Sequence, residues 1–593
     1  MTSSVQKLAL LRAAMIRNGI DVYILPSSDP HLGEYIPDHW KIVPWLTGFT
    51  GSAATVVITN EFAGLFTDSR YFIQAQNELA DSGIILVKPE PFKAPDYVDW
   101  LYKIIARSSR IGFDGKIISV TQYRRMENKL KDRGISYNTD CDLITDIWNE
   151  RPPMPDSEAS DHPVKYSGID RSAKISRVRE QMKQQLIDVH LLTSPDDIMW
   201  LLNIRGSDLA YSPLLSSFAL ISDSRLLFFT ESKKVPNELS EEFSRLGIEM
   251  HPYNEITGFL STLRENSSIL ITPVTTSVKL FNSIPGKLRI TEDISIPCRL
   301  KAIRNKTEIE NTGRVMIKDG VALTKFFYWF EQNLGREVMT ELSLADKLLC
   351  FRSQQSDFIG PAFPAIIAFN EHSALPHYTP ETGHDSEICE NGILLVDSGG
   401  QYRGGTTDIT RTIATGIPTA KQRTDFTLVL KGHINLASVK FPAGTRGYQL
   451  DAFARKDLWE KGMNYGHGTG HGVGYCLNVH EGPQNISPGD TKVAMEAGML
   501  TSNEPAIYRE GEYGIRIENL ILCFEDEETE FGQFLKFDTV SLCYIDIKLI
   551  DKSLLDTMET TWLNRYHSEV YDKLSPHLSE SEKRWLKEKT DFI

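Results

Sequence analysis

Two pairs of carboxylates, with a glycine-rich histidine segment between them, lie in the second half of the chain and have the residue types of a two-metal centre. Two divalent cations about 3.5–4 Å apart require several carboxylates, some of them bridging, together with an imidazole and a hydroxide. A ligand set rich in oxygen and free of thiolates suits manganese, magnesium or zinc. The candidate ligands, in chain order, are Asp397, Asp408, His471, Glu504 and Glu518.

The first carboxylate pair belongs to a predicted hairpin. Asp397 ends the apolar run 393–396, and Asp408 lies eleven residues later, inside the run 406–412. Four glycines between the two carboxylates favour a turn, so we expect the acids on neighbouring antiparallel strands. A carboxylate that ends a buried strand is costly unless a cation compensates its charge, and a metal ion supplies that cation.

The second pair repeats this arrangement. Glu504 lies in the run 499–505, and Glu518 lies in the strand-like run 513–519 after a turn. Arg516 shares a face with Glu518, because side chains alternate along a strand. We therefore expect Arg516 to reach the carboxylates, to balance their charge and to fix their orientation.

The segment 465–474 has five glycines among ten residues, which lets its backbone approach a ligand closely. Its histidines, with His480 and the more distant His377, offer nitrogen ligands or acid/base groups near pH 7. The alternatives are a plain tight loop or a phosphate loop, although the segment lacks the Gly-Lys-Ser/Thr ending of the latter. Single acids are usually solvated, and we expect His372 and His384 to be packed or exposed. The joint order of hairpin, loop and hairpin favours the metal site.

Alternating helices and strands must position these groups. Asn305 and Glu308 stand in N-cap and N3 relation and predict the start of a long helix. From there onward, helical stretches alternate with strand-like runs, which is an α+β pattern. The predicted helices are 305–333, 420–440 and 447–462, and the predicted strands are 393–397, 407–413, 499–508 and 513–523.

The first half of the chain contains two similar segments without a catalytic cluster of their own. Trp45-Leu46 and Gly51-Ser52 recur as Trp200-Leu201 and Gly206-Ser207, both offset by 155 positions. Each segment alternates short apolar runs with amphipathic stretches, which predicts an α/β domain with a mixed sheet. Chance similarity between two α/β segments is the alternative to a duplication.

Domain boundaries follow from composition. The stretch 151–163 is rich in proline and polar residues and is typical of an interdomain linker. A second boundary is expected before the helix that begins near Asn305. The predicted domains are 1–151, 152–303 and 304–593, so the chain is a multidomain protein that combines α/β and α+β architectures.

Charge and cysteine content exclude several classes. The chain has 64 basic and 79 acidic residues, a net charge of −15, which argues against nucleic acid as a partner. Its seven cysteines form no C-x-x-C motif, which favours a reducing compartment. No stretch approaches the roughly 18 to 20 apolar residues of a membrane span, and no signal peptide is expected. We predict a soluble cytoplasmic protein without a membrane partner.

At the five candidate ligands the chain closely resembles aminopeptidase P of the long, three-domain cytosolic type. This group belongs to metallopeptidase family M24, within the pita-bread superfamily. The phrases 45–52, 66–71 and 465–483 add to the resemblance, which spans nearly the whole chain. It implies two creatinase-type N-terminal α/β domains, a C-terminal pita-bread catalytic domain and a homodimer.

The resemblance also implies a metal arrangement. Asp397 would chelate one ion, His471 and Glu504 the other, and Asp408 and Glu518 would bridge the two. Manganese is the first choice, with zinc or magnesium as alternatives. A hydroxide shared by the ions would attack the carbonyl before proline, and Glu504, or a metal-linked water beside it, would pass a proton to the prolyl nitrogen.

Substrate contacts follow from the same resemblance. His377 and His480 match histidines that polarise the scissile carbonyl, and His467 matches a residue that lines the proline pocket. Tyr508 and Arg516 match supporting residues around the substrate. The expected partners are peptides with proline at position 2.

Four other functions compete with this one. A prolidase cleaves Xaa-Pro dipeptides and usually has one N-terminal domain, so the length of this chain favours aminopeptidase P. Methionine aminopeptidase ordinarily consists of the catalytic domain alone, and creatinase lacks this metal set. Members that lost their ligands bind proteins such as histones, but all five ligand positions are present here.

Overall fold

The computed structural model describes residues 3–68, 71–88, 96–380 and 383–593. The chain divides into an N-terminal and a C-terminal compact unit. Ser69 and Arg70, in one of the family-like phrases, lie outside the described residues. The N-terminal unit comprises Met1–Asp161, Asp170–Ala210 and Leu214–Pro297, and the C-terminal unit comprises His162–Ile169, Tyr211–Pro213 and Cys298–Ile593.

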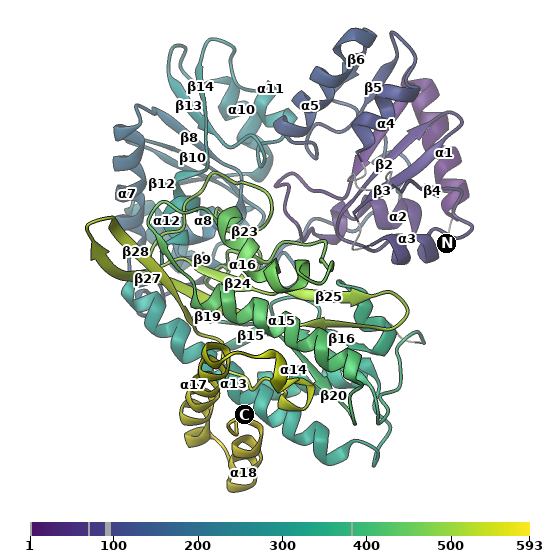
Figure 1. The fold of residues 1–593 in the computed structure, drawn as a ribbon. Helices are drawn as coiled ribbons and strands as arrows, with labels where there is room; N and C mark the ends of the chain where they lie inside the picture. Colours follow the sequence, from purple (N-terminus) through teal and green to yellow (C-terminus); the bar gives the residue numbers. More distant parts are fainter. Residues whose placement is uncertain (1–2, 69–70, 89–95, 381–382) are drawn as a thin grey trace. The chain divides into compact units, whose positions relative to one another are not determined.

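The first sheet of the N-terminal unit is mixed, with the strand order β4-β3-β2-β1-β5-β6 (Figure 1). β1 pairs antiparallel with β2 on one side and parallel with β5 on the other, and the edge strand β4 pairs parallel with β3. Its strands are β1 (Val22–Pro26), β2 (Ala54–Thr59), β3 (Ala63–Thr67), β4 (Ile85–Leu86), β5 (Arg110–Gly112) and β6 (Ser136–Asn138).

Both faces of this sheet are covered, which explains why β1, β2 and β3 are almost continuously apolar. Tyr23 and Leu25 of β1 pack in one core with α1 and α2, whereas Val22 and Ile24 pack in the other with α4 and α5. Side chains on a strand alternate between faces, so one apolar run serves two cores. The helices are α1 (Ser4–Arg17), α2 (Ile42–Thr47), α3 (Phe72–Glu78), α4 (Tyr97–Ile104) and α5 (Val120–Leu130).

The second sheet has the same plan, with the order β12-β11-β10-β8-β13-β14. β8 pairs antiparallel with β10 and parallel with β13, as β1 does with β2 and β5. Strand order and pairing thus match between the two similar segments of the sequence. Its elements are β8 (Val189–Leu192), β10 (Phe218–Ser222), β11 (Leu226–Phe229), β12 (Ile248–His251), β13 (Ser268–Ile271), β14 (Arg289–Glu292), α7 (Arg171–Gln184), α8 (Pro195–Leu202), α9 (Asn237–Arg245), α10 (Ile256–Ser261) and α11 (Val278–Asn282).

The C-terminal unit begins with the predicted long helix, α13 (Lys306–Asn333). Asn305 and Glu308 form the predicted capping box, in which each side chain accepts from the backbone N–H of the other residue. The other two predicted helices are also confirmed, as α15 (Ala420–Ser438) and α16 (Gly447–Trp459). Further helices are α14 (Glu341–Ser353), α17 (Thr557–Leu574) and α18 (Glu580–Lys589).

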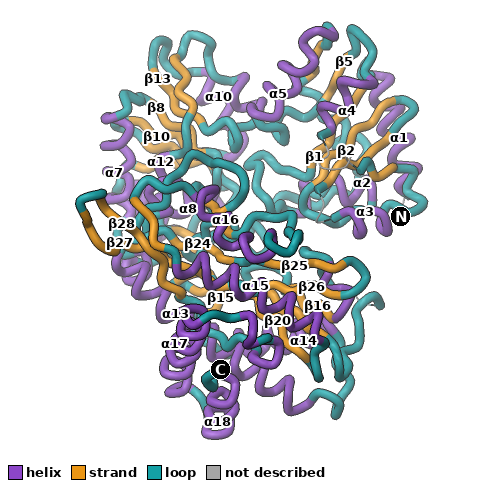
Figure 2. The backbone as a smooth tube through the Cα atoms, in the orientation of Figure 1, coloured by secondary structure: helices purple, strands orange, loops and turns teal. Residues whose placement is uncertain are grey.

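Small antiparallel sheets fill the rest of this unit (Figure 2). The sheets pair as β16-β17-β20, β15-β18-β19, β21-β28-β27-β24, β25-β26 and β22-β23. Their strands are β15 (Phe358–Pro361), β16 (Ile366–Phe369), β17 (Ile393–Ser398), β18 (Gly400–Tyr402), β19 (Gly405–Thr406), β20 (Ile409–Ala414), β21 (Lys440–Pro442), β22 (Gly470–His471), β23 (Asn485–Ile486), β24 (Leu500–Asn503), β25 (Ala506–Arg509), β26 (Tyr513–Arg516), β27 (Asn519–Thr529) and β28 (Gly532–Thr539).

Two of the predicted strands are wrong as single elements. The run 499–508 divides into β24 and β25 at Glu504-Pro505, and the run 513–523 divides into β26 and β27 at Ile517-Glu518. Pro505 has no N–H to donate to a ladder, so a continuous strand is disfavoured there. In the described part of the chain, no helix has both the length and the apolar composition that crossing a bilayer requires.

Candidate metal centre

The first carboxylate pair lies where one hairpin leaves one sheet and enters another. β17 pairs with β20, and the segments that continue these two strands toward the turn pair as β18 with β19. Asp397 is the fifth residue of β17 and lies opposite Thr410, while Asp408 directly precedes β20. The predicted neighbouring antiparallel strands are therefore present, with both acids at the change of sheet.

The second pair occupies the same kind of position. Asn503 at the end of β24 pairs with Asn519 at the start of β27, and Ala506 of β25 pairs with Arg516 of β26. Glu504 and Glu518 fall in the gap between these two ladders. Both side chains are thus free of the regular alternation of a strand and can turn to the same point.

The structure brings together all five predicted ligand side chains, which we call the carboxylate cage. The side chains form overlapping groups whose ligand atoms lie within 4.8 Å of one another. His471 Nε2 lies 3.4 Å from Asp408 Oδ2 and 3.5 Å from Glu504 Oε1. The groups are Asp397, Asp408 and Glu518; His471, Glu504 and Glu518; and Asp408, His471 and His480.

Arg516 contacts the cage as predicted, since its Nη2 donates to Asp397 Oδ2. Its Nη1 donates to Tyr508 OH at 2.6 Å, and Tyr508 OH lies 2.9 Å from His467 Nε2. A continuous chain of polar contacts thus joins His467 to Asp397. The guanidinium is buried, so water screens its charge toward the cage less than it would screen a surface charge.

Glycines of the 465–474 segment allow neighbouring backbone to pack closely against it. A Cβ at Gly470 would lie 1.9 Å from Ser502 O, and one at Gly472 would lie 2.0 Å from Glu481 O. At these two glycines the segment therefore lies directly against neighbouring backbone. This close approach orients His471, whose Nδ1 contacts Gly472 O at 2.9 Å and whose Nε2 faces the carboxylates. Such a contact fixes the tautomer of a ligating histidine.

The electrostatics of the cage call for a cation. Burial raises the pKa of Glu504 to about 6 and the pKa of Glu518 well above its usual range. Burial lowers the pKa of His471, but the hydrogen bond to Asp408 and the charge of Glu504 outweigh it and raise that pKa to about 9. The buried Asp397 Oδ1 has no hydrogen-bond partner. Oxygen donors, an imidazole and an orphaned carboxylate oxygen fit divalent metal ions.

The remaining predicted histidines lie on two segments. His480 packs edge to face against His471, with ring centroids 4.3 Å apart. His377 is partly exposed and follows η5 (Asn370–Ala374), one residue before Tyr378. His384 is exposed, as predicted, whereas His372 is half-buried and bonds to Glu341.

Three supporting residues were not predicted. Thr410 Oγ1 donates to Glu518 Oε2 at 2.7 Å and accepts from Arg516 Nε at 3.1 Å. Ser502 Oγ donates to Glu504 Oε1 at 3.1 Å, and Arg411 Nη1 donates to Glu518 O at 2.7 Å. Thr410 is two residues after Asp408 and shares its face, so the period of two could have identified it. No local pattern marks Arg411.

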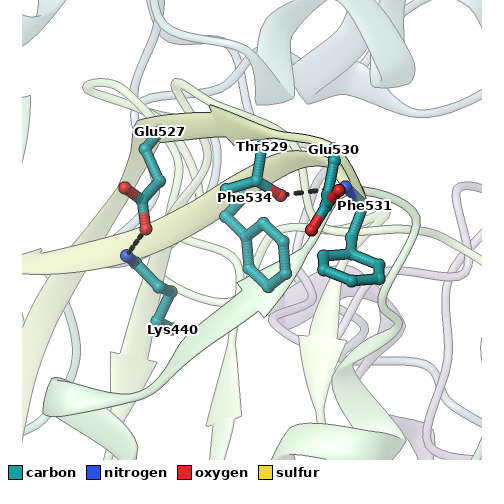
Figure 3. Close-up of a pocket in the computed structure, with 6 residues that line it drawn as sticks. All are labelled: Lys440, Glu527, Thr529, Glu530, Phe531 and Phe534. Carbon is teal, nitrogen blue, oxygen red and sulfur yellow. Dashed lines mark hydrogen bonds and ion pairs between the residues drawn. The ribbon is translucent and has the colours of Figure 1, made fainter.

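A pocket of about 450 Å³ at the end of the β27–β28 hairpin is not this site (Figure 3). Lys440 pairs there with Glu527, and Phe531 N donates to Thr529 Oγ1 at 3.1 Å (Figure 3). Phe531 and Phe534 supply the apolar lining. None of the lining residues belongs to the carboxylate cage, and the pocket holds no histidine that could act near pH 7.

Comparison with known proteins agrees with this geometry. Residues 310–525 match metallopeptidase family M24, and residues 533–593 match the C-terminal region of that peptidase. Residues 7–146 and 150–308 each match a creatinase/prolidase N-terminal domain. The two halves of the N-terminal unit are therefore related to the same kind of domain.

Relatives match over nearly the full length. Aminopeptidase P2 of Arabidopsis thaliana is 36% identical, over 96% of this chain and 85% of its own. Xaa-Pro aminopeptidase app-1 of Caenorhabditis elegans is 36% identical, over 95% of this chain and 94% of its own. The crystal structure of a C. elegans X-prolyl aminopeptidase, described as a cytosolic enzyme with a di-nuclear active site, superposes with a TM-score of 0.96 at 35% identity, over 100% of both chains.

Proposed function

The chain belongs to metallopeptidase family M24, among its Xaa-Pro aminopeptidases, and from that premise we propose that it removes the N-terminal residue from peptides with proline at position 2. The observation that carries the proposal is the carboxylate cage. Four acids and a histidine from two hairpins and a loop form overlapping groups whose ligand atoms lie within 4.8 Å of one another. The matching domains, with creatinase-type modules before a pita-bread catalytic domain, are those of the relatives.

The grouping of ligand atoms supports a division of labour within the cage. Asp408, Glu518 and His471 each belong to two of the overlapping groups, and of these three only the two carboxylates have a second oxygen with which to bridge. Asp397 belongs to one of them, and Glu504 to another with His471. We assign Asp397 to one ion, His471 and Glu504 to the other, and both bridges to Asp408 and Glu518, with manganese ahead of zinc or magnesium.

Residues of the chain then carry the reaction. Two divalent ions held by the carboxylate cage would supply the positive charge that makes a water nucleophilic at neutral pH. Glu504, whose pKa is raised by burial, takes up the proton of the nucleophile and passes it to the leaving prolyl nitrogen. His377 and His480 stabilise the negative charge that develops on the scissile carbonyl oxygen.

Supporting groups orient the substrate. His467 lines the proline pocket, and its contact with Tyr508 links it to Arg516 and so to Asp397. The amide before proline has no N–H and a fixed ring, so peptidases that bind that N–H fail on it. A site that holds the free amine and the ring instead accepts it.

Assembly and location follow the same proposal. We propose a homodimer in the cytoplasm, with the domains 1–151, 152–303 and 304–593. None of the seven cysteines, all of which lie in the described ranges, forms a disulfide, and this suits a reducing compartment.

The test is hydrolysis of matched peptides with and without manganese. Arg-Pro-Pro should be cut fastest, ahead of Arg-Ala-Pro and of an Xaa-Pro dipeptide. Comparable cleavage of Arg-Ala-Pro would contradict the proline specificity, and fastest cleavage of the dipeptide would identify a prolidase. Purified protein that retains no divalent ion after incubation with manganese would point to a binding protein that has lost catalysis.

A further inference from the structure

The segment that carries His377 connects two neighbouring strands of the cage sheet. It leaves β16 at Phe369 and returns at β17, and Ile366 of β16 lies opposite the ligand Asp397. Within this segment, η5 is followed by the turn that contains His377. Whatever fixes this segment therefore fixes His377 relative to the cage.

Glu341 holds the segment on both sides of His377. It is the first residue of α14 and has no exposed surface. Its Oε1 accepts from Phe369 N at 2.7 Å, and its Oε2 accepts from Ser386 N at 2.8 Å. One buried carboxylate thus binds two backbone amides that are seventeen residues apart in the sequence.

Two side chains close to His377 converge on the same carboxylate. Tyr378 OH donates to Glu341 Oε2 at 2.6 Å, and His372 Nδ1 lies 3.0 Å from both oxygens. The two rings stack, with centroids 4.5 Å apart. The hydrogen bond to Glu341 raises the pKa of His372, so the contact is an ion pair over a wider pH range. We call these five residues, Glu341, Phe369, His372, Tyr378 and Ser386, the Glu341 clamp.

On its other side the segment rests on β26. Gly514 N donates to Ser373 Oγ at 2.6 Å, and a Cβ at Gly514 would lie 1.8 Å from Ser373 O. No other residue fits at Gly514 without moving η5. Gly514 lies two residues before Arg516, which holds Asp397, so η5 is seated on the strand that supports the cage.

We propose that Glu341 is a positioning residue for catalysis, which fixes His377 against the strand that supports the carboxylate cage. The inference rests on the proposed function, because the place of His377 matters only if the site cuts peptides. Glutamine cannot replace this carboxylate. Phe369 and Ser386 offer backbone N–H groups that only donate, whereas a glutamine side chain has a single accepting atom. In Glu341→Gln, one of these two buried backbone N–H groups would therefore face the amide NH₂ and lose its acceptor.

The experiment is a double-mutant cycle on the manganese-loaded full chain, with Arg-Pro-Pro as the substrate. Glu341→Gln should lower kcat/KM about 30-fold, and His377→Ala about 100-fold, while the double variant loses little more than His377→Ala alone. The metal content of Glu341→Gln should equal that of the unsubstituted protein. Losses that multiply in the double variant, or a loss of metal, would overturn the inference.

A second pair of variants covers the case in which Glu341→Gln does not fold. Tyr378→Phe removes one hydrogen bond to the clamp and should cost a few-fold in kcat/KM alone, but nothing further with His377→Ala. The control is Glu559→Gln, at another buried carboxylate of the unit, which accepts from Lys431 Nζ and from the backbone N–H of Asp556. It should leave kcat/KM within about twofold in both backgrounds. If the unsubstituted protein does not cut Arg-Pro-Pro, the proposed function is refuted. That outcome differs from losses that multiply in an active protein, which refute only the role of Glu341.

Discussion

Two of the places where the C-terminal unit buries acidic side chains differ in how the charge is satisfied. The carboxylate cage brings together four acids, and one of its oxygens, Asp397 Oδ1, is buried without a partner. The Glu341 clamp contains one acid, and four groups of the protein donate to its two oxygens.

The comparison shows that burial alone does not identify a metal site. What distinguishes the two places is the ratio of carboxylates to donors, because a buried carboxylate without donors requires a cation or a proton. The clamp is complete without an ion. The cage is not, so changes in the cage should affect metal binding and changes in the clamp should not.

The largest effect is expected at a shared ligand. Asp408→Asn removes the charge of a carboxylate that we assign to both ions, so activity should fall by three orders of magnitude or more, at about 4 kcal/mol of transition-state stabilisation. Elemental analysis should find less bound metal. Unchanged metal content in this variant, together with unchanged activity, would show that Asp408 is not a metal ligand.

Metal binding should also release protons, which the clamp cannot do. In the metal-free cage the pKa of His471 is about 9, so its imidazole is protonated at pH 7 and must lose a proton to become a ligand. Metal affinity should therefore rise with pH up to about 9 and level off above it. Calorimetric titration in buffers of different ionisation enthalpy measures the released protons, and none at pH 7 would contradict this charge state.

A change in the groups that support the cage should have an intermediate effect. Arg516→Lys keeps one positive charge but cannot bond to Asp397, Tyr508 and Thr410 at once, so metal affinity or activity should fall about 10- to 100-fold. Metal titration and kcat/KM are the measurements. A variant with wild-type values in both would show that Arg516 only fills space.

The smallest effect is expected for a single contact of the clamp. Tyr378→Phe removes one of several donors to Glu341, so the free energy of unfolding should fall by about 1 kcal/mol. Urea unfolding followed by fluorescence measures it, with metal content as the second readout. Loss of metal in this variant would mean that the two acidic places are not independent.

The sequence by itself predicted most of the elements and the five candidate ligands. Caps and periodicity are local, so Asn305 and Glu308 predicted the start of α13, and the three long helices were predicted to within three residues at their ends. The five ligand types were recognisable in chain order, because their residue types are rare together. Thr410 was within reach of the same reasoning, since it shares a face with Asp408.

Only the tertiary structure decided how these residues meet. The breaks at Glu504-Pro505 and Ile517-Glu518 turn two acids toward each other, and they depend on a change of sheet partners that no local pattern specifies. The glycines of the 465–474 segment turned out to accommodate neighbouring backbone, such as Ser502 O. Glu341 accepts from a backbone N–H that is 28 positions away, and Arg411 donates to a backbone oxygen that is 107 positions away. Such pairings are set by packing across the whole fold, which local sequence patterns do not reveal.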